Sequence, residues 1–157
     1  MKKLLGILVL GLLWCNVGVA SETLFFCKDK LNDSEVLQGF NFEKMLMTRW
    51  NDQVIPYHPM VFLNGKYIWV EERDNVNDPK AVKNSRVINY FNKESKELEK
   101  WFFPLSDAEV ANLQIKIHEG KGITWFEDGP KFVEYQQKII NELYSPKGKF
   151  RLNCSIN

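Results

Sequence analysis

Residues 60–70 read MVFLNGKYIWV, which is two apolar runs joined by Asn64-Gly65. A two-residue type I′ turn needs positive φ at both central positions, and asparagine and glycine adopt that conformation at the lowest cost. The stretch therefore predicts a β-hairpin whose register is fixed by the turn. The predicted cross-strand pairs are Leu63 with Lys66, Phe62 with Tyr67, Val61 with Ile68 and Met60 with Trp69, and one further step would set His58 opposite Glu71.

The two faces of this hairpin are both apolar but differ in kind. Successive side chains of a strand point to opposite faces, so one face is aliphatic and the other aromatic. A large aromatic face is rarely left open to water, so it lines a cavity, lies under a helix or binds a ligand. Core filling is the commoner use of large aromatics, and we expect it for Trp69. The candidate ligand-binding residues on this face and at its end are His58, Phe62, Tyr67, Trp69 and Glu71.

Residues 1–20 have the features of a secretory signal peptide: two lysines, an apolar run over 4–14, and small residues before Ser21. The apolar run is shorter than the roughly 20 residues that span a bilayer. We therefore predict that the signal is cleaved, leaving residues 21–157 as one exported domain with no integral membrane segment. Periplasmic or secreted localisation follows. The lysine-rich and asparagine-rich composition suggests an AT-rich bacterial genome.

Cleavage would also change the formal net charge, because it removes two lysines from a chain of charge +1 and leaves −1. A near-neutral domain without a basic stripe argues against a nucleic-acid partner. The mature chain would keep two cysteines, Cys27 and Cys154, one near each end. In an exported protein the default expectation is a disulfide. That bridge would place the last strand of the chain beside the first.

The remaining patterns predict a single α+β domain. Ser106 and Glu109 form a capping box that starts a short helix over 107–114, and Asp128 with Pro130 starts a longer amphipathic helix over 130–144. We expect a twisted antiparallel sheet of six to eight strands with the C-terminal helix packed on one face, or a small closed barrel with that helix at its end. A polar loop is expected over 71–83. Other strands are expected at 23–27, 36–42, 86–91, 97–103, 123–126 and 149–156.

No catalytic motif is present, since the chain lacks a P-loop, a dinucleotide fingerprint, a zinc-protease motif and a nucleophile elbow. The oxygen-rich residues over 71–78 do not match the spacing of an EF-hand, so no metal and no cofactor are predicted. We expect a non-enzymatic binding or envelope-associated domain. Its partner is open: a small apolar or sugar ligand, or an envelope protein. The alternative is a small hydrolase that uses His58 with Glu71 or Glu72.

Overall fold

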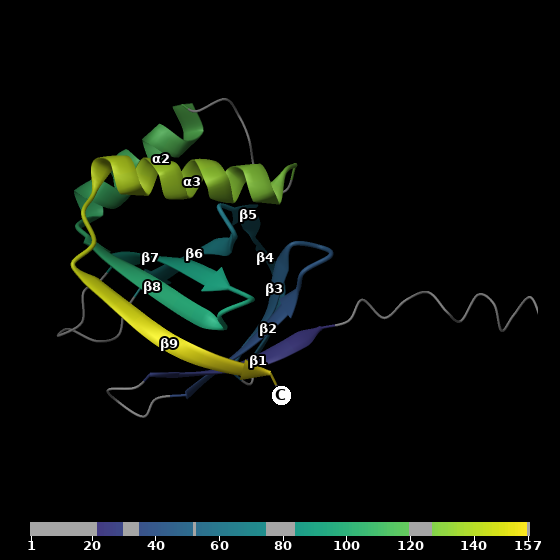
Figure 1. Cartoon of the computed structure of the whole chain (residues 1–157). Helices are drawn as coiled ribbons and strands as arrows, with labels where there is room; N and C mark the ends of the chain where they lie inside the picture. Colours follow the sequence, from purple (N-terminus) through teal and green to yellow (C-terminus); the bar gives the residue numbers. More distant parts are fainter. Residues whose placement is uncertain (1–21, 30–34, 52, 75–83, 120–126, 157) are drawn as a thin grey trace, which may run out of the picture.

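The computed structural model describes residues 22–29, 35–51, 53–74, 84–119 and 127–156 (Figure 1). Within these ranges nine strands form one antiparallel sheet, and two helices lie together on one side of it. The predicted α+β class, with an antiparallel sheet and a C-terminal helix on it, is confirmed. The predicted signal peptide and the strand predicted at 123–126 fall outside the described residues. The elements are β1 Thr23–Asp29, β2 Glu35–Asn41, β3 Leu46–Trp50, β4 Gln53–Pro59, β5 Val61–Leu63, β6 Lys66–Asp74, β7 Asn84–Asn92, β8 Glu97–Leu105, α2 Asp107–Glu119, α3 Gly129–Leu143 and β9 Gly148–Ile156.

The sheet has the strand order β4-β3-β2-β1-β9-β8-β7-β6-β5. The last strand therefore lies at the centre, between β1 and β8, and joins the two halves of the sheet (Figure 1). Cys27 on β1 is directly opposite Cys154 on β9, and the two form a disulfide. The predicted disulfide and the predicted pairing of the terminal strands are both confirmed.

The two edges of the described sheet meet in the sequence. β4 and β5 are at opposite ends of the strand order, yet Met60 alone separates them along the chain. The Met60 N–H donates to the Met45 carbonyl (2.7 Å), which directs the chain toward β3 on one side of this residue. On the N-terminal side of Met60, β4 pairs with β3; on its C-terminal side, β6 pairs with β7. The sheet is therefore curved but not closed by hydrogen bonds, and we call the region between β4 and β6 the seam.

The predicted hairpin is present with its predicted turn. Asn64 and Gly65 have φ of 50° and 76°, and the ladder pairs Val61 with Ile68 as expected. The ladder ends there, because Met60 bonds to Met45 instead of continuing along β6. The expected Met60–Trp69 and His58–Glu71 pairs are therefore wrong. His58 pairs with Met47 of β3.

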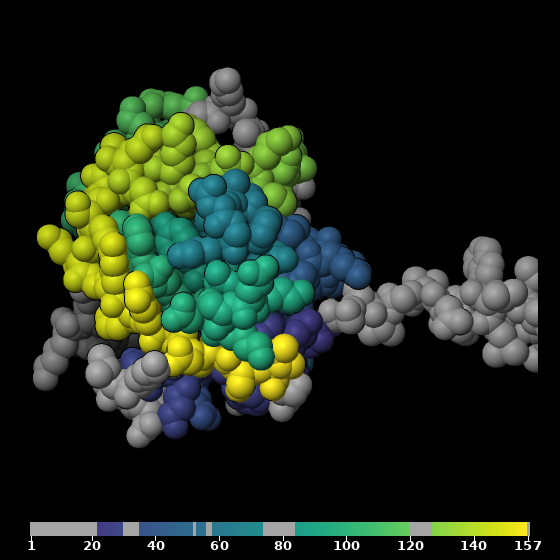
Figure 2. Space-filling model, in the orientation of Figure 1, coloured from purple at the N-terminus to yellow at the C-terminus, as the bar shows by residue number. Residues whose placement is uncertain are grey.

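The curved sheet buries apolar side chains on both of its faces. The aliphatic face of the hairpin packs under α3, whose Val133 and Ile140 are buried against it. The tip of the β5–β6 hairpin lies directly against this helix in the space-filling view (Figure 2). The other face of the sheet encloses a second core that includes Trp69. The buried members of this inner core are Phe25, Cys27, Phe40, Met47, Met60, Trp69, Phe91, Leu98, Leu152 and Cys154.

Local signals in the sequence explain where the helices begin. The Ser106 side chain accepts from the Glu109 N–H (3.3 Å) while the Glu109 carboxylate accepts from the Ser106 N–H (2.7 Å), so the capping box is formed. α2 runs five residues beyond the predicted 107–114. Asp128 caps α3 by accepting from the Lys131 N–H (3.1 Å), with Pro130 in the first turn. α3 ends at Leu143, as the apolar spacing indicates.

Two further sequence expectations differ from the structure. Residues 71–74, predicted as loop, continue β6, because their pairing with β7 extends to Asp74 and Asn84. The alternation in residues 149–156 predicts that Phe150, Leu152, Cys154 and Ile156 face inward. Leu152 and Cys154 are buried, but Phe150 and Ile156, near the two ends of β9, are 50% and 56% exposed. No described helix has the length and apolarity needed to cross a membrane.

Candidate functional site

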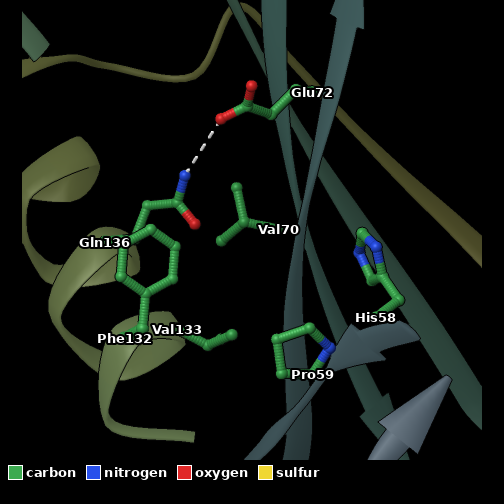
Figure 3. Close-up of a pocket in the computed structure, with 7 residues that line it drawn as sticks. All are labelled: His58, Pro59, Val70, Glu72, Phe132, Val133 and Gln136. Atoms are coloured by element: carbon green, nitrogen blue, oxygen red, sulfur yellow. Dashed lines mark hydrogen bonds between the residues drawn. The ribbon is translucent and has the colours of Figure 1, made fainter. Parts of the chain in front are cut away.

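A pocket of about 350 Å³ lies at the seam, where β4 and β6 diverge under the first turns of α3 (Figure 3). Two strands and one helix supply its walls, so the lining is held by regular secondary structure. The residues that line it are His58 and Pro59 from β4, Val70 and Glu72 from β6, and Phe132, Val133 and Gln136 from α3. We call this cavity the seam pocket.

The helix reaches the pocket because its start and its buried stripe are both fixed. The Asp128 cap sets where α3 begins, and Val133 anchors it in the outer core. Gln136 follows on the same stripe and is only 4% exposed, although it is polar. Phe132 is half-buried at the rim. Pro59, Val70, Phe132 and Val133 give the pocket an apolar wall.

Glu72 and Gln136 form the polar end of the pocket. The Gln136 Nε2 donates to Glu72 Oε1 across 3.4 Å, from α3 to β6 (Figure 3). Arg86 Nε lies 3.4 Å from the same oxygen, and this arginine is itself 3% exposed. The Glu72 side chain remains 55% exposed. This carboxylate is therefore held in place and still open to a ligand.

His58 forms the opposite polar wall. It comes from β4 and lines the pocket together with Val70 of β6. Burial lowers the pKa of His58 below 6.5, and the charges of Glu71 and Glu72 and the Val70 backbone oppose that shift without reversing it. His58 is therefore neutral at pH 7. One of its ring nitrogens then carries a lone pair that accepts hydrogen bonds.

Glu71 was predicted as a site residue, but it points into the inner core and does not line the pocket. Trp69 Nε1 donates to Glu71 Oε1 (3.3 Å), Arg73 Nη2 donates to Oε2 (2.8 Å), and Lys100 Nζ is 3.6 Å away. Burial raises the pKa of Glu71, but Lys100 and Arg73 outweigh it and hold that pKa below its usual value. Glu71 is thus a neutralised internal charge. The same burial lowers the pKa of Lys100.

The aromatic candidates also lie outside the pocket. Trp69 is fully buried against Phe40, with ring centroids 5.4 Å apart. Phe62 is 52% exposed at the hairpin and contacts Tyr67, whose ring packs on Phe42. Of the five predicted site residues, the structure therefore brings only His58 into the seam pocket.

Sequence reasoning missed the helical side of the site. Phe132, Val133 and Gln136 were interpreted as a core stripe, and the signal that pointed beyond packing was the amide of Gln136 inside that stripe. Val70 belongs to the predicted hairpin, where its side chain was expected on the aliphatic face. Glu72 had been named only as a partner of His58 in the hydrolase alternative, and it does share the pocket with that histidine.

A second cavity of about 120 Å³ lies on the outer face of β6–β9. It is smaller, and the charges around it are paired with one another: Glu99 accepts from Lys66 (3.4 Å) and from Arg151 (3.3 Å). Across the described ranges, no group of three or more His, Cys, Asp or Glu side chains could hold a metal ion. The seam pocket is the better candidate for binding.

No family model, no curated protein and no solved structure matches this chain. The chemistry of the pocket must therefore be argued from its own residues. It combines a histidine and a carboxylate, but the described lining includes no hydroxyl and no thiol. A Ser-His-acid or Cys-His arrangement needs such a nucleophile within hydrogen-bond reach of the base.

Proposed function

We propose that this protein is an exported, non-enzymatic binding module whose ligand occupies the seam pocket. The observation that carries the proposal is the lining: an apolar wall with a few polar groups held on two strands and a helix (Figure 3). Ligand sites in proteins typically have this composition, with volumes from about 300 Å³ upward. The volume suits a small molecule or a single side chain of a partner.

Two features support the proposed export: the disulfide between the terminal strands and the signal-like residues 1–20. The Cys27–Cys154 disulfide joins the first and last strands, and such bridges persist in oxidising compartments. The signal-like residues 1–20 point the same way. A periplasmic or secreted location is therefore proposed together with the binding function, and the ligand would be met outside the cytoplasm.

An NMR screen with small apolar and sugar-like compounds tests the binding proposal. Compounds that bind should shift the backbone resonances of β4, β6 and the first turns of α3. Phe132→Ala removes part of the apolar wall and should weaken those compounds. Leu143→Ala is the matched control, because it truncates an apolar side chain at the far end of the same helix, 44% exposed and outside the pocket. Binding that maps elsewhere, or that is unaffected by Phe132→Ala, would contradict the assignment.

A hydrolase that uses His58 with Glu72 is the second candidate. It is favoured by one observation, that both side chains line the same pocket and could act as general base and acid. Such an enzyme would have to activate water directly, since the described lining offers no protein nucleophile. Turnover of short-chain p-nitrophenyl esters that disappears in His58→Gln would support this candidate over the binding module.

A further inference from the structure

Glu72 and Gln136 leave hydrogen-bond acceptors at the polar end of the seam pocket. Gln136 Nε2 donates to Glu72 Oε1. The groups that can still accept at this end are the second carboxylate oxygen of Glu72 and the Oε1 of Gln136, which Figure 3 shows turned toward Val70.

The charge on the pocket lining also favours a ligand that donates hydrogen bonds, because it is negative. Glu72 is the one formally charged side chain among the described lining residues. Arg86, buried on β7, forms an ion pair with its Oε1 (3.4 Å) and is not among the lining residues. A ligand that enters the pocket therefore meets a carboxylate from its open side. An anionic ligand would be repelled there, and a neutral one would leave that charge without a new partner.

The apolar wall restricts the ligand further. Phe132 presents a ring at the rim, and Pro59, Val70 and Val133 continue the wall inward. Such a wall suits a short hydrocarbon body, and a ring beside a carboxylate is a favourable place for a cation. Hydrated metal ions would gain nothing from the apolar side.

We infer that the seam pocket recognises a primary ammonium group carried on a short apolar chain. This inference deepens the proposed binding function and rests on it. The ammonium would donate to the Glu72 carboxylate and to the Oε1 of Gln136, which lie together at one end of the pocket. The hydrocarbon body lies along Phe132 and Val133. The ammonium can belong to a free amine or to a lysine side chain of a polypeptide, since both present the same chemistry.

Hexylammonium is the probe, with hexan-1-ol and hexanoate as matched comparisons of equal chain length. Each is titrated at neutral pH into the mature protein with its disulfide intact, and backbone NMR shifts of β4, β6 and α3 give the Kd. We expect hexylammonium to bind about fivefold tighter than hexanol, a ratio in keeping with one partly exposed ion pair. We expect no saturable shift of pocket residues with hexanoate.

Two variants that each remove one negative charge distinguish an effect of the pocket carboxylate from an effect of the net charge of the protein. Glu72→Gln should remove the preference for hexylammonium over hexanol. Glu142→Gln deletes the same charge from an exposed position at the far end of α3 and should leave both affinities unchanged. Because Glu72→Gln also deprives the buried Arg86 of its carboxylate, its fold is checked by amide dispersion, and Glu72→Asp should restore the preference if the charge is the cause.

The possible failures are distinguishable. Hexanol that binds the pocket as tightly as hexylammonium would overturn the ammonium inference while leaving the binding function in place. An absence of pocket shifts with all three probes would overturn the inference and remove support from the binding function as well. Equal affinity for hexylammonium and for an Nα-acetyl-lysine amide would support the inference and extend it to a lysine side chain of a partner.

Discussion

Truncating Trp69 to alanine tests whether the aromatic hairpin face is core. The side chain is fully buried, and its ring packs on Phe40 with 5.4 Å between centroids. Replacing a buried tryptophan by alanine costs about 3 to 5 kcal/mol through lost burial and the cavity left behind. Trp69 also donates to Glu71, which is 6% exposed. Losing one donor to a buried carboxylate adds to the cost, although Glu71 keeps Arg73.

We therefore expect a loss of about 4 to 6 kcal/mol for Trp69→Ala, combining truncation with the lost charged hydrogen bond. Domains of this size have a free energy of unfolding of about 5 to 15 kcal/mol. The variant should thus be poorly folded at best. Trp69→Phe keeps most of the ring but not the N–H, and should lose about 1 to 3 kcal/mol.

Urea denaturation of the oxidised protein, followed by circular dichroism, measures these losses. Phe62→Ala is the matched control, because it removes an aromatic side chain from the same hairpin at a position that is 52% exposed. Its loss should be about 1 kcal/mol, mostly from the contact with the Tyr67 ring. A loss below about 1 kcal/mol for Trp69→Ala, in the range of surface substitutions, would refute the assignment of this face to the core.

Three further predictions concern stability. Because the folded pKa of His58 lies below its unfolded value of 6.5, the unfolded chain binds the proton first, so the free energy of unfolding should fall as pH drops below 6.5; urea titrations between about pH 8 and pH 5 should show a weaker fall in His58→Gln. Alkylation of the unfolded, non-reduced protein should label neither Cys27 nor Cys154, and reduction should lower the stability by about 2 to 5 kcal/mol. Gly39→Ala should lower the stability by about 1 to 3 kcal/mol in thermal unfolding, since a Cβ there would lie 2.7 Å from that of Arg49.

The parts of the fold that were predicted correctly depend on short-range chemistry. The Asn64-Gly65 turn, the Ser106 capping box and the Asp128 cap act within four residues of themselves, so the sequence displays them directly. The disulfide is long-range, but the chain expected after signal cleavage has two cysteines, which leave one pairing within it.

The parts that were missed depend on partners far away in the chain. The pairing of the hairpin strands stops before Met60, whose N–H donates to the Met45 carbonyl instead. Nothing in residues 60–70 specifies that partner. Glu71 was expected at the start of a polar loop, because the sequence turns polar after Val70. Its burial is compensated by Arg73 and Trp69 on its own strand and by Lys100, which the pairing of β6, β7 and β8 brings within 3.6 Å.

The seam explains why the candidate site lies where it does. A hairpin that is apolar on both faces needs cover on each, and a curved sheet with a helix outside supplies both. Since β4 and β5 are joined by one residue, the strands must diverge from Met60, and β6 beyond Ile68 has no strand partner on that side among the described residues. His58 of β4 and Val70 of β6 line this gap together. A ligand bound there would contact β4, β6 and α3 together, and should raise the free energy of unfolding by RT ln(1 + [L]/Kd).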